Sequence, residues 1–98
     1  MTVTLTPNDR GTAEQLARLL KAVADPARLQ LIALIRSSED RQACVCDLTA
    51  AVGLSQPTVS HHLKTLVDAG LLTRQKRGYW TWYSLVPERM AQIAAVLS

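Results

Sequence analysis

Apolar residues recur at helical spacing near the start of the chain. After residues 1–11, which lack periodicity and are expected to form a flexible N-terminal arm, a helix is predicted over 13–24. Thr12 and Gln15 have the form of a capping box at its start, because their side chains can satisfy free backbone N–H groups. The apolar face of this helix consists of Leu16, Leu19, Leu20 and Val23.

Two further helices are predicted to open on a proline, a residue favoured in the first helical turn. Asp25 caps the first of them, which begins at Pro26 and ends near Arg36. The polar residues SSEDRQ that follow are interpreted as a connection. Near the other end of the chain, Pro87 begins a last helix over 87–97 with one apolar face.

Two shorter helical patterns lie in the middle of the chain, separated by a tight turn. A helix over 45–52 stops at Gly53, which suits a left-handed cap, and Ser55 caps a second helix that stops at Gly70. Two short helices with a glycine-containing turn between them are typical of a helix-turn-helix, here over 45–69.

The hydrophobic period changes from helical to alternating over 71–85. Residues rich in β-formers alternate there on either side of Gly78, which predicts a β-hairpin. The predicted order is therefore α-α-α-α-β-β-α, a mainly α winged helix-turn-helix in which 71–85 is the β-wing. We expect residues 1–98 to form a single domain.

Composition changes this picture little. The chain has 98 residues, 48% of them hydrophobic, and a net charge of +3, which suits a compact domain with a mild basic excess compatible with nucleic acid. So short a chain buries only a modest fraction of its surface, which favours a partner subunit. Neither a signal pattern nor a membrane-spanning apolar run occurs, so we expect a cytoplasmic protein with reduced thiols and no membrane partner.

The helix that follows Ser55 is predicted to have two distinct faces. Val59, Leu63 and Leu66 cluster on one side at about 100° per residue and are expected to face the core. The outward side is polar, as expected of a helix that enters the major groove of DNA, and the basic hairpin tip would contact phosphates. The candidate DNA-binding residues are Ser55, Gln56, Thr58, Ser60, His61, Lys64, Arg74, Lys76 and Arg77.

Other residues of this region are assigned to the fold. His62 lies at the edge of the apolar face and is expected to be half-buried and bonded within the protein, in contrast to the outward His61. The aromatic residues of the second hairpin arm are expected to pack and to pair strands rather than to stack on bases. They are Tyr79, Trp80, Trp82 and Tyr83.

Cys44 and Cys46 are the only two cysteines of the chain. A bridge between them would close a small strained ring and crosslink almost nothing, so two separate thiols are expected instead of a structural disulfide.

Four stretches together resemble the ArsR/SmtB family of dimeric bacterial repressors, which leave their operators when they bind a metal or metalloid. They are ADPARLQLI at 24–32, CVCDL at 44–48, GLSQPTVSHHLKTLVDAGLL at 53–72 and WYSL at 82–85. The resemblance implies a homodimer paired through the first and last helices and an operator DNA that is an inverted repeat. The interface would comprise Leu16, Leu19, Leu20, Met90, Ile93 and Leu97.

The CVCDL motif is similar to that of arsenic- and antimony-sensing members. It implies that Cys44 and Cys46 bind As(III) or Sb(III) as inducer, with no organic cofactor, because soft thiophilic ions select thiolates. On a regular helix the two thiols would point about 160° apart, so the helix start must be irregular or become so on binding. Some arsenic sensors have a third cysteine where this chain has Thr49, which leaves the third ligand open.

Other functions remain open. The same cysteine pair could sense cadmium or lead, or thiol oxidation, in a repressor of the same class. A thiol enzyme with a histidine base and a winged-helix protein-interaction module belong to other classes. The DNA-facing position of the histidines argues against the enzyme, and the basic wing tip argues against the interaction module.

Overall fold

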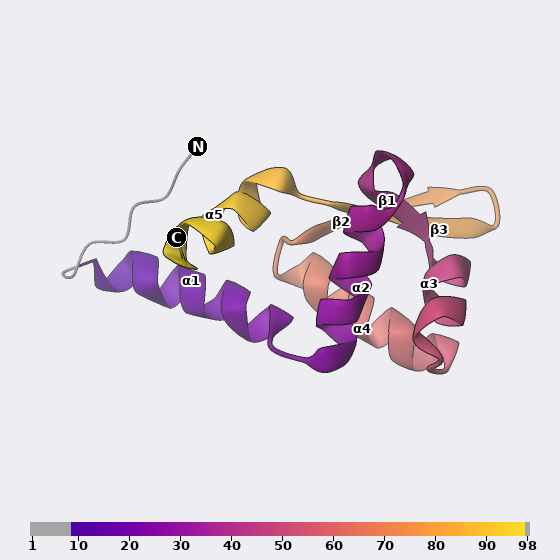
Figure 1. Cartoon of the computed structure of the whole chain (residues 1–98), viewed down its shortest axis with the longest axis horizontal. Helices are drawn as coiled ribbons and strands as arrows, with labels where there is room; N and C mark the ends of the chain where they lie inside the picture. Colours follow the sequence, from indigo (N-terminus) through magenta and orange to yellow (C-terminus); the bar gives the residue numbers. More distant parts are fainter. Residues whose placement is uncertain (1–8, 98) are drawn as a thin grey trace.

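The computed structural model describes residues 9–97, which form a helix-turn-helix with a β-wing (Figure 1). Its α-helices are α1 Arg10–Val23, α2 Pro26–Ser37, α3 Val45–Val52, α4 Gln56–Asp68 and α5 Pro87–Leu97. Its strands are β1 Gln42–Cys44, β2 Leu72–Arg77 and β3 Trp80–Leu85, and a short 3-10 turn, η1, covers Glu39–Arg41. The predicted winged helix-turn-helix is confirmed, with one strand more than expected. No helix among the described residues is long and apolar enough to cross a membrane.

α1 begins at Arg10, earlier than the predicted residue 13. The predicted capping box at Thr12 is wrong, because the N-cap is Asp9, whose carboxylate accepts the backbone N–H of Thr12 at 2.9 Å. The Thr12 hydroxyl donates to the same carboxylate, and these hydrogen bonds lower the pKa of Asp9 below its ordinary value. Residues 10 and 11 are therefore helical instead of part of the arm, and 1–8 lie outside the described residues.

The segment interpreted as a polar connection contains η1 and β1, neither of which was predicted. β1 pairs antiparallel with β3, with Ala43 opposite Tyr83 and Cys44 opposite Trp82. The resulting sheet has the strand order β1-β3-β2. A three-residue strand is too short to show an alternating pattern, and its partner comes only after the helix-turn-helix, so no local signal marks it.

Fully buried leucines and isoleucines hold the helix-turn-helix against the rest of the protein. The exposed fractions are 0% for Leu31 and Ile35 of α2, 2% for Leu48 of α3, and 0% for Leu63 and Leu66 of α4. They belong to one apolar cluster that also includes Tyr83 of the wing. The three helices and the sheet therefore share a core, which sets the orientation of α4.

α1 and α5 lie together at the end of the molecule opposite the wing (Figure 1). Leu16 and Leu19 of α1 are 3% and 5% exposed and belong to the chain's own core. The side chain of Leu97 lies outside the described part of the chain. The members of the predicted dimer interface that remain only partly buried are Leu20, Met90 and Ile93. These three keep surface available for a second copy.

Gly53 ends α3 in the left-handed region, with a φ of 70° that favours glycine. A Cβ added there meets nothing within 4 Å, so only backbone strain opposes a side chain. Gly53→Ala is expected to lower the free energy of unfolding by about 1 kcal/mol, measured by urea denaturation. The matched control is Gly11→Ala in α1, where a Cβ also has open space and where alanine is favoured by up to about 1 kcal/mol. Equal effects of the two substitutions would contradict the left-handed turn.

Candidate nucleic-acid interface and thiol site

α4 turns one face to the core and the other to solvent. Val59, Leu63 and Leu66 are each 0% exposed. On the outer face Gln56, Thr58, His61 and Lys64 are exposed and Ser60 is partly buried. The Ser55 hydroxyl caps the helix by accepting the backbone N–H of Thr58, and it donates to the Thr58 hydroxyl at 2.9 Å. The first turn of α4 therefore presents polar groups to solvent.

A groove of about 860 Å³ separates the outer face of α4 from the sheet. Among the residues that line it are Ser60, His61 and Lys64 of α4 and Arg74 of β2. Candidate DNA-binding residues from two separate segments thus meet at one surface. Lys64 Nζ lies 2.8 Å from the Asp68 carboxylate, so this cation is already paired within α4.

The cations of the wing lie on two faces of the sheet. Side chains alternate along a strand, so Arg74, which is opposite Tyr83, shares its face with Lys76. This is the face that lines the groove beside α4. Arg77 belongs to the other face, where its guanidinium carbon lies 5.1 Å from the centre of the Trp82 ring. The three cations expected around the hairpin tip are therefore divided.

Only part of the aromatic set packs as expected. Tyr83 is 5% exposed and Trp82 is partly buried. Tyr79 and Trp80 are 97% and 53% exposed, so the packing expectation is wrong for these two residues. The reason is the short reach of β1, which pairs only with residues 82–84 of β3 and leaves the end of the hairpin uncovered.

The two cysteines converge at the start of α3. Cys44 ends β1 and is the N-cap of α3, with extended backbone angles (φ −83°, ψ 152°). Because Cys44 is not helical, its side chain can turn toward that of Cys46, and the two sulfur atoms are bonded across a Cα–Cα distance of 5.4 Å. The expectation of two separate thiols is therefore wrong for this structure, because this Cα separation lies in the ordinary disulfide range. The irregular helix start that two converging thiols require is present.

The neighbours of the sulfurs define the donor set of the site. One ligand atom each of Cys44, Cys46 and Asp47 lies within 4.8 Å of the others. Thr49, which stands where a third cysteine was considered, donates its hydroxyl to the Val45 carbonyl at 2.7 Å. Thr49 is thus committed to its own helix. Asp47, for which the sequence predicted no ligand role, is the nearby oxygen donor.

His62 is half-buried and bonded within the fold, as predicted. Its Nδ1 lies 3.1 Å from Arg28 Nη1 and 3.9 Å from the Asp25 carboxylate, and it accepts from Arg28 because arginine has only donors. Arg28 also donates from Nε to the Ala22 carbonyl, and its backbone N–H bonds Asp25, which lowers the pKa of that carboxyl. Arg28 therefore ties α4 to the junction of α1 and α2, a role with no local sequence signal.

Comparison with known proteins places these features in a family. Residues 25–74 match the profile of the arsR family of bacterial regulatory proteins. The chain is 38% identical to a helix-turn-helix-type transcriptional regulator of Methanocaldococcus jannaschii, over 82% of this chain and 88% of that protein. It is 41% identical to the arsenical resistance operon repressor of Escherichia coli, over 82% of this chain and 67% of that repressor. A crystal structure described as a possible transcriptional regulator for arsenical resistance shares the fold with a TM-score of 0.74 and 34% identity, covering 82% of this chain and 80% of that one.

A polar α4 surface beside a basic wing, on this fold and with these relatives, defines a DNA-binding transcriptional regulator and not an enzyme. The chain belongs to the ArsR family of bacterial regulatory proteins. The matched residues 25–74 run from the N-cap of α2 through the thiol site and α4 into β2.

Replacing Arg28 tests the bridge that positions α4. Arg28→Met keeps the apolar stem but leaves the Ala22 carbonyl and His62 Nδ1 without their donor. The free energy of unfolding is expected to fall by about 1–3 kcal/mol, the usual effect of leaving partly buried polar groups unpaired. The control is Arg36→Met at the exposed end of the same helix, with an expected change within about 0.5 kcal/mol. Urea denaturation of both variants decides, and equal stabilities would show that the bridge contributes nothing.

Proposed function

We propose that this regulator represses transcription by binding operator DNA as a homodimer and leaves the DNA when As(III) or Sb(III) binds Cys44 and Cys46. The observation that carries the proposal is the convergence of the two sulfurs at the irregular start of α3. The name of the Escherichia coli relative, arsenical resistance operon repressor, supports the same class of inducer.

Inducer capture needs both cysteines as thiols. Reduction of their bond by a small dithiol transfers two electrons and two protons and yields two S–H groups. These condense with As(OH)₃ to form two S–As bonds with release of two water molecules, and one hydroxide remains on arsenic. A soft ion prefers the two thiolates, and the Asp47 carboxylate, within 4.8 Å of the sulfurs, offers an oxygen to the third position.

α3 supplies the connection from the thiol site to α4. Cys44 directly precedes α3, and Leu48, one turn further on, is 2% exposed in the core that α3 shares with α4. Gly53 then joins the two helices in a tight turn. A backbone change at Cys44 therefore moves α3 against α4. Release requires the inducer to bind the DNA-free form more tightly, by a coupling free energy of about 1–3 kcal/mol or more.

On DNA, α4 enters the major groove and the wing contacts the phosphate backbone. The groove between α4 and the sheet supports this arrangement, because it brings Arg74 to the same surface as the polar face of α4. Candidates for contacts to base edges are Thr58, Ser60 and His61. Candidates for phosphate contacts are Ser55, Gln56, Lys64, Arg74, Lys76 and Arg77.

Two copies pair through α1 and α5. The partly buried Leu20, Met90 and Ile93 leave apolar surface on these adjacent helices, and burial against a second copy removes it from water. A two-fold dimer presents two α4 helices and so reads an inverted repeat.

Thiol oxidation is a second candidate signal, favoured by the bond between the two sulfurs in the structure. Two thiols would transfer two electrons and two protons to hydrogen peroxide, giving the disulfide and two molecules of water. In that case peroxide releases the operator without any metalloid.

The thiol site is tested by an arsenite titration of operator-bound protein under reducing conditions, followed by fluorescence anisotropy. Wild type is expected to release the operator. Cys44→Ser and Cys46→Ser are expected to bind DNA but to stay bound, because serine is nearly isosteric with cysteine yet a poor ligand for a soft ion. The matched control is Thr49→Ser, which keeps the hydroxyl that bonds Val45 and should release like wild type.

Parallel titrations with antimonite, cadmium, lead and peroxide identify the signal. If cadmium or lead releases the operator and arsenite does not, the inducer is that metal and not a metalloid. If only peroxide releases the operator, the protein senses thiol oxidation. If both serine variants release as wild type does, the cysteine pair is not the sensor.

Base and phosphate contacts are separable by their salt dependence. Ser60→Ala and His61→Ala are expected to reduce discrimination against scrambled operator, because a base contact contributes about 1–3 kcal/mol. Lys76→Ala is expected to weaken binding to all sequences and to lower the log–log salt slope by about 0.9 per lost contact. The measurement is operator and scrambled-DNA affinity over a salt series. Full discrimination in both α4 variants would remove these two residues from base reading.

A further inference from the structure

Trp82 lies between the thiol pair and the basic strand of the wing. It stands directly opposite Cys44 in the β1–β3 pairing and opposite Gln75 in the β2–β3 pairing. Directly opposed side chains of antiparallel strands are neighbours, with Cβ atoms about 4.5–5.5 Å apart. The indole side chain therefore adjoins Cys44, which is 4% exposed, on one side and the wing strand on the other.

Arg77 is held over the Trp82 ring. Its guanidinium carbon is 5.1 Å from the ring centre, within the range of a cation–π contact. Its Nε and Nη2 donate to Gln75 Oε1 at 3.0 and 2.8 Å. Both contacts turn this cation toward the sheet face that continues from Cys44, away from the groove beside α4.

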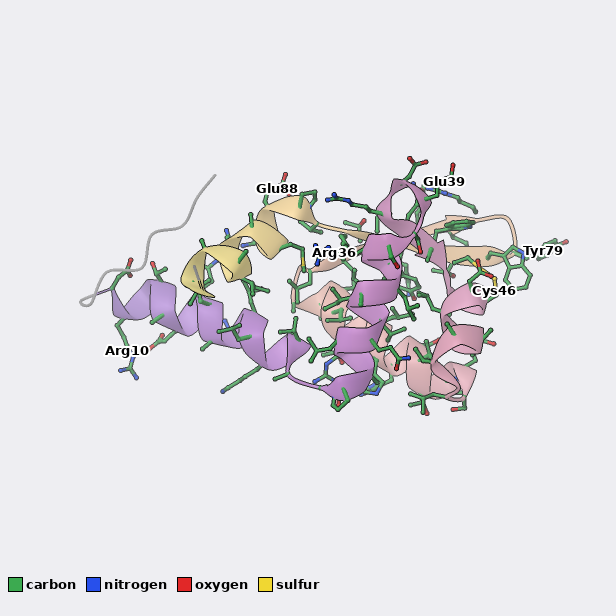
Figure 2. All side chains as sticks on the ribbon, viewed as in Figure 1. Arg10, Arg36, Glu39, Cys46, Tyr79 and Glu88 are labelled. Carbon is green, nitrogen blue, oxygen red and sulfur yellow. A yellow bond between two sulfur atoms is a disulfide. The ribbon has the colours of Figure 1, made fainter. Side chains whose placement is uncertain are left out.

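A cavity of about 660 Å³ lies between α3 and this face of the wing. The residues that line it include Asp47 and Leu48 of α3, Glu39 and Asp40 of η1, and Arg77 and Trp82 of the wing. The Arg77 and Trp82 side chains therefore border open space and can move without displacing the core. Cys46 and the wing-tip residue Tyr79 lie at the same end of the molecule (Figure 2).

We infer that Trp82 couples the state of the thiol pair to DNA binding by holding Arg77 away from the phosphates when the two sulfurs are joined. In the structure the sulfurs are joined and Arg77 rests on Trp82. When the pair opens, the Cys44 side chain is no longer tethered to Cys46, its packing against Trp82 changes, and Arg77 becomes available to a phosphate. Trp82 is thus a positioning residue that acts through Arg77.

This inference rests on the proposed function in one respect. A metalloid that bonds both sulfurs closes the pair through one bridging atom, as the S–S bond closes it directly. The wing then provides a second route from the thiol site to DNA, independent of the movement of α3 against α4.

The test compares operator binding with the pair opened by dithiothreitol and closed by diamide, which accepts two electrons and two protons from the two thiols. The readout is the slope of log affinity against log salt concentration, measured by fluorescence anisotropy at low salt where both forms bind. Opening the pair is expected to steepen the slope by about 0.9 for each wing, the contribution of one phosphate contact.

Substitutions in the wing test which side chains cause the slope difference between the opened and closed forms. Trp82→Leu is expected to abolish the slope difference, and Trp82→Phe, which keeps an aromatic face, to retain it. Arg77→Ala changes an exposed side chain and is expected to abolish the difference by lowering the slope of the opened form to that of the closed form. Matched controls are Tyr79→Leu in the turn at the hairpin tip, where the side chain is 97% exposed, and Arg74→Ala on the opposite face. Both should keep the difference, although Arg74→Ala lowers both slopes.

Equal slopes for the opened and closed wild type would overturn the inference, as would a full difference in Trp82→Leu or in Arg77→Ala. Should Trp82→Leu fail to fold, Arg77→Ala and Trp82→Phe decide. An arsenite arm separates this result from the proposed function. If arsenite releases the wild type but the opened and closed forms have equal salt slopes, the proposed function stands and the coupling through Trp82 is rejected. If the slope difference depends on Trp82 but arsenite does not release the operator, the proposed inducer is rejected and the coupling stands.

Discussion

The antiparallel pairing of β1 with β3 keeps Cys44 extended at the point where α3 begins. An extended residue followed by a helical turn lets two side chains in a Cys-x-Cys spacing meet, whereas a continuous helix would direct them about 160° apart. The same pairing sets Cys44 opposite Trp82 of the wing. One short strand therefore both shapes the thiol site and connects it to the wing.

α4 depends on contacts from several directions. Its leucines are fully buried in the common core, and Arg28 links His62 to the junction of α1 and α2. Its outer face stays exposed beside the wing, where Lys64 is paired with Asp68. The phosphate contact proposed for Lys64 would therefore replace an existing interaction, and contacts of this kind make association sensitive to salt.

Local sequence patterns predicted most of the architecture. The faces of α1 and α4 follow from apolar spacing, and the turn at Gly53 and the hairpin at Gly78 follow from residues that adopt positive φ. The half-buried position of His62 also follows from its place at the edge of an apolar face. Local capping was less decisive, since Asp9 and Thr12 both suit an N-cap and the structure uses Asp9.

The sequence by itself determined the winged helix-turn-helix, the inward faces of its helices and the CVCDL resemblance, because periodicity and turn residues act over a few positions. Only the tertiary structure decided that β1 exists, that the sulfurs converge, and that Arg77 turns to Trp82 instead of joining Arg74. The first two features depend on the pairing of β1 with β3, which are separated in sequence by the whole helix-turn-helix. The third depends on which face of the hairpin Arg77 occupies. Without its partner strand, a three-residue strand cannot be recognised and the face to which each side chain points cannot be assigned.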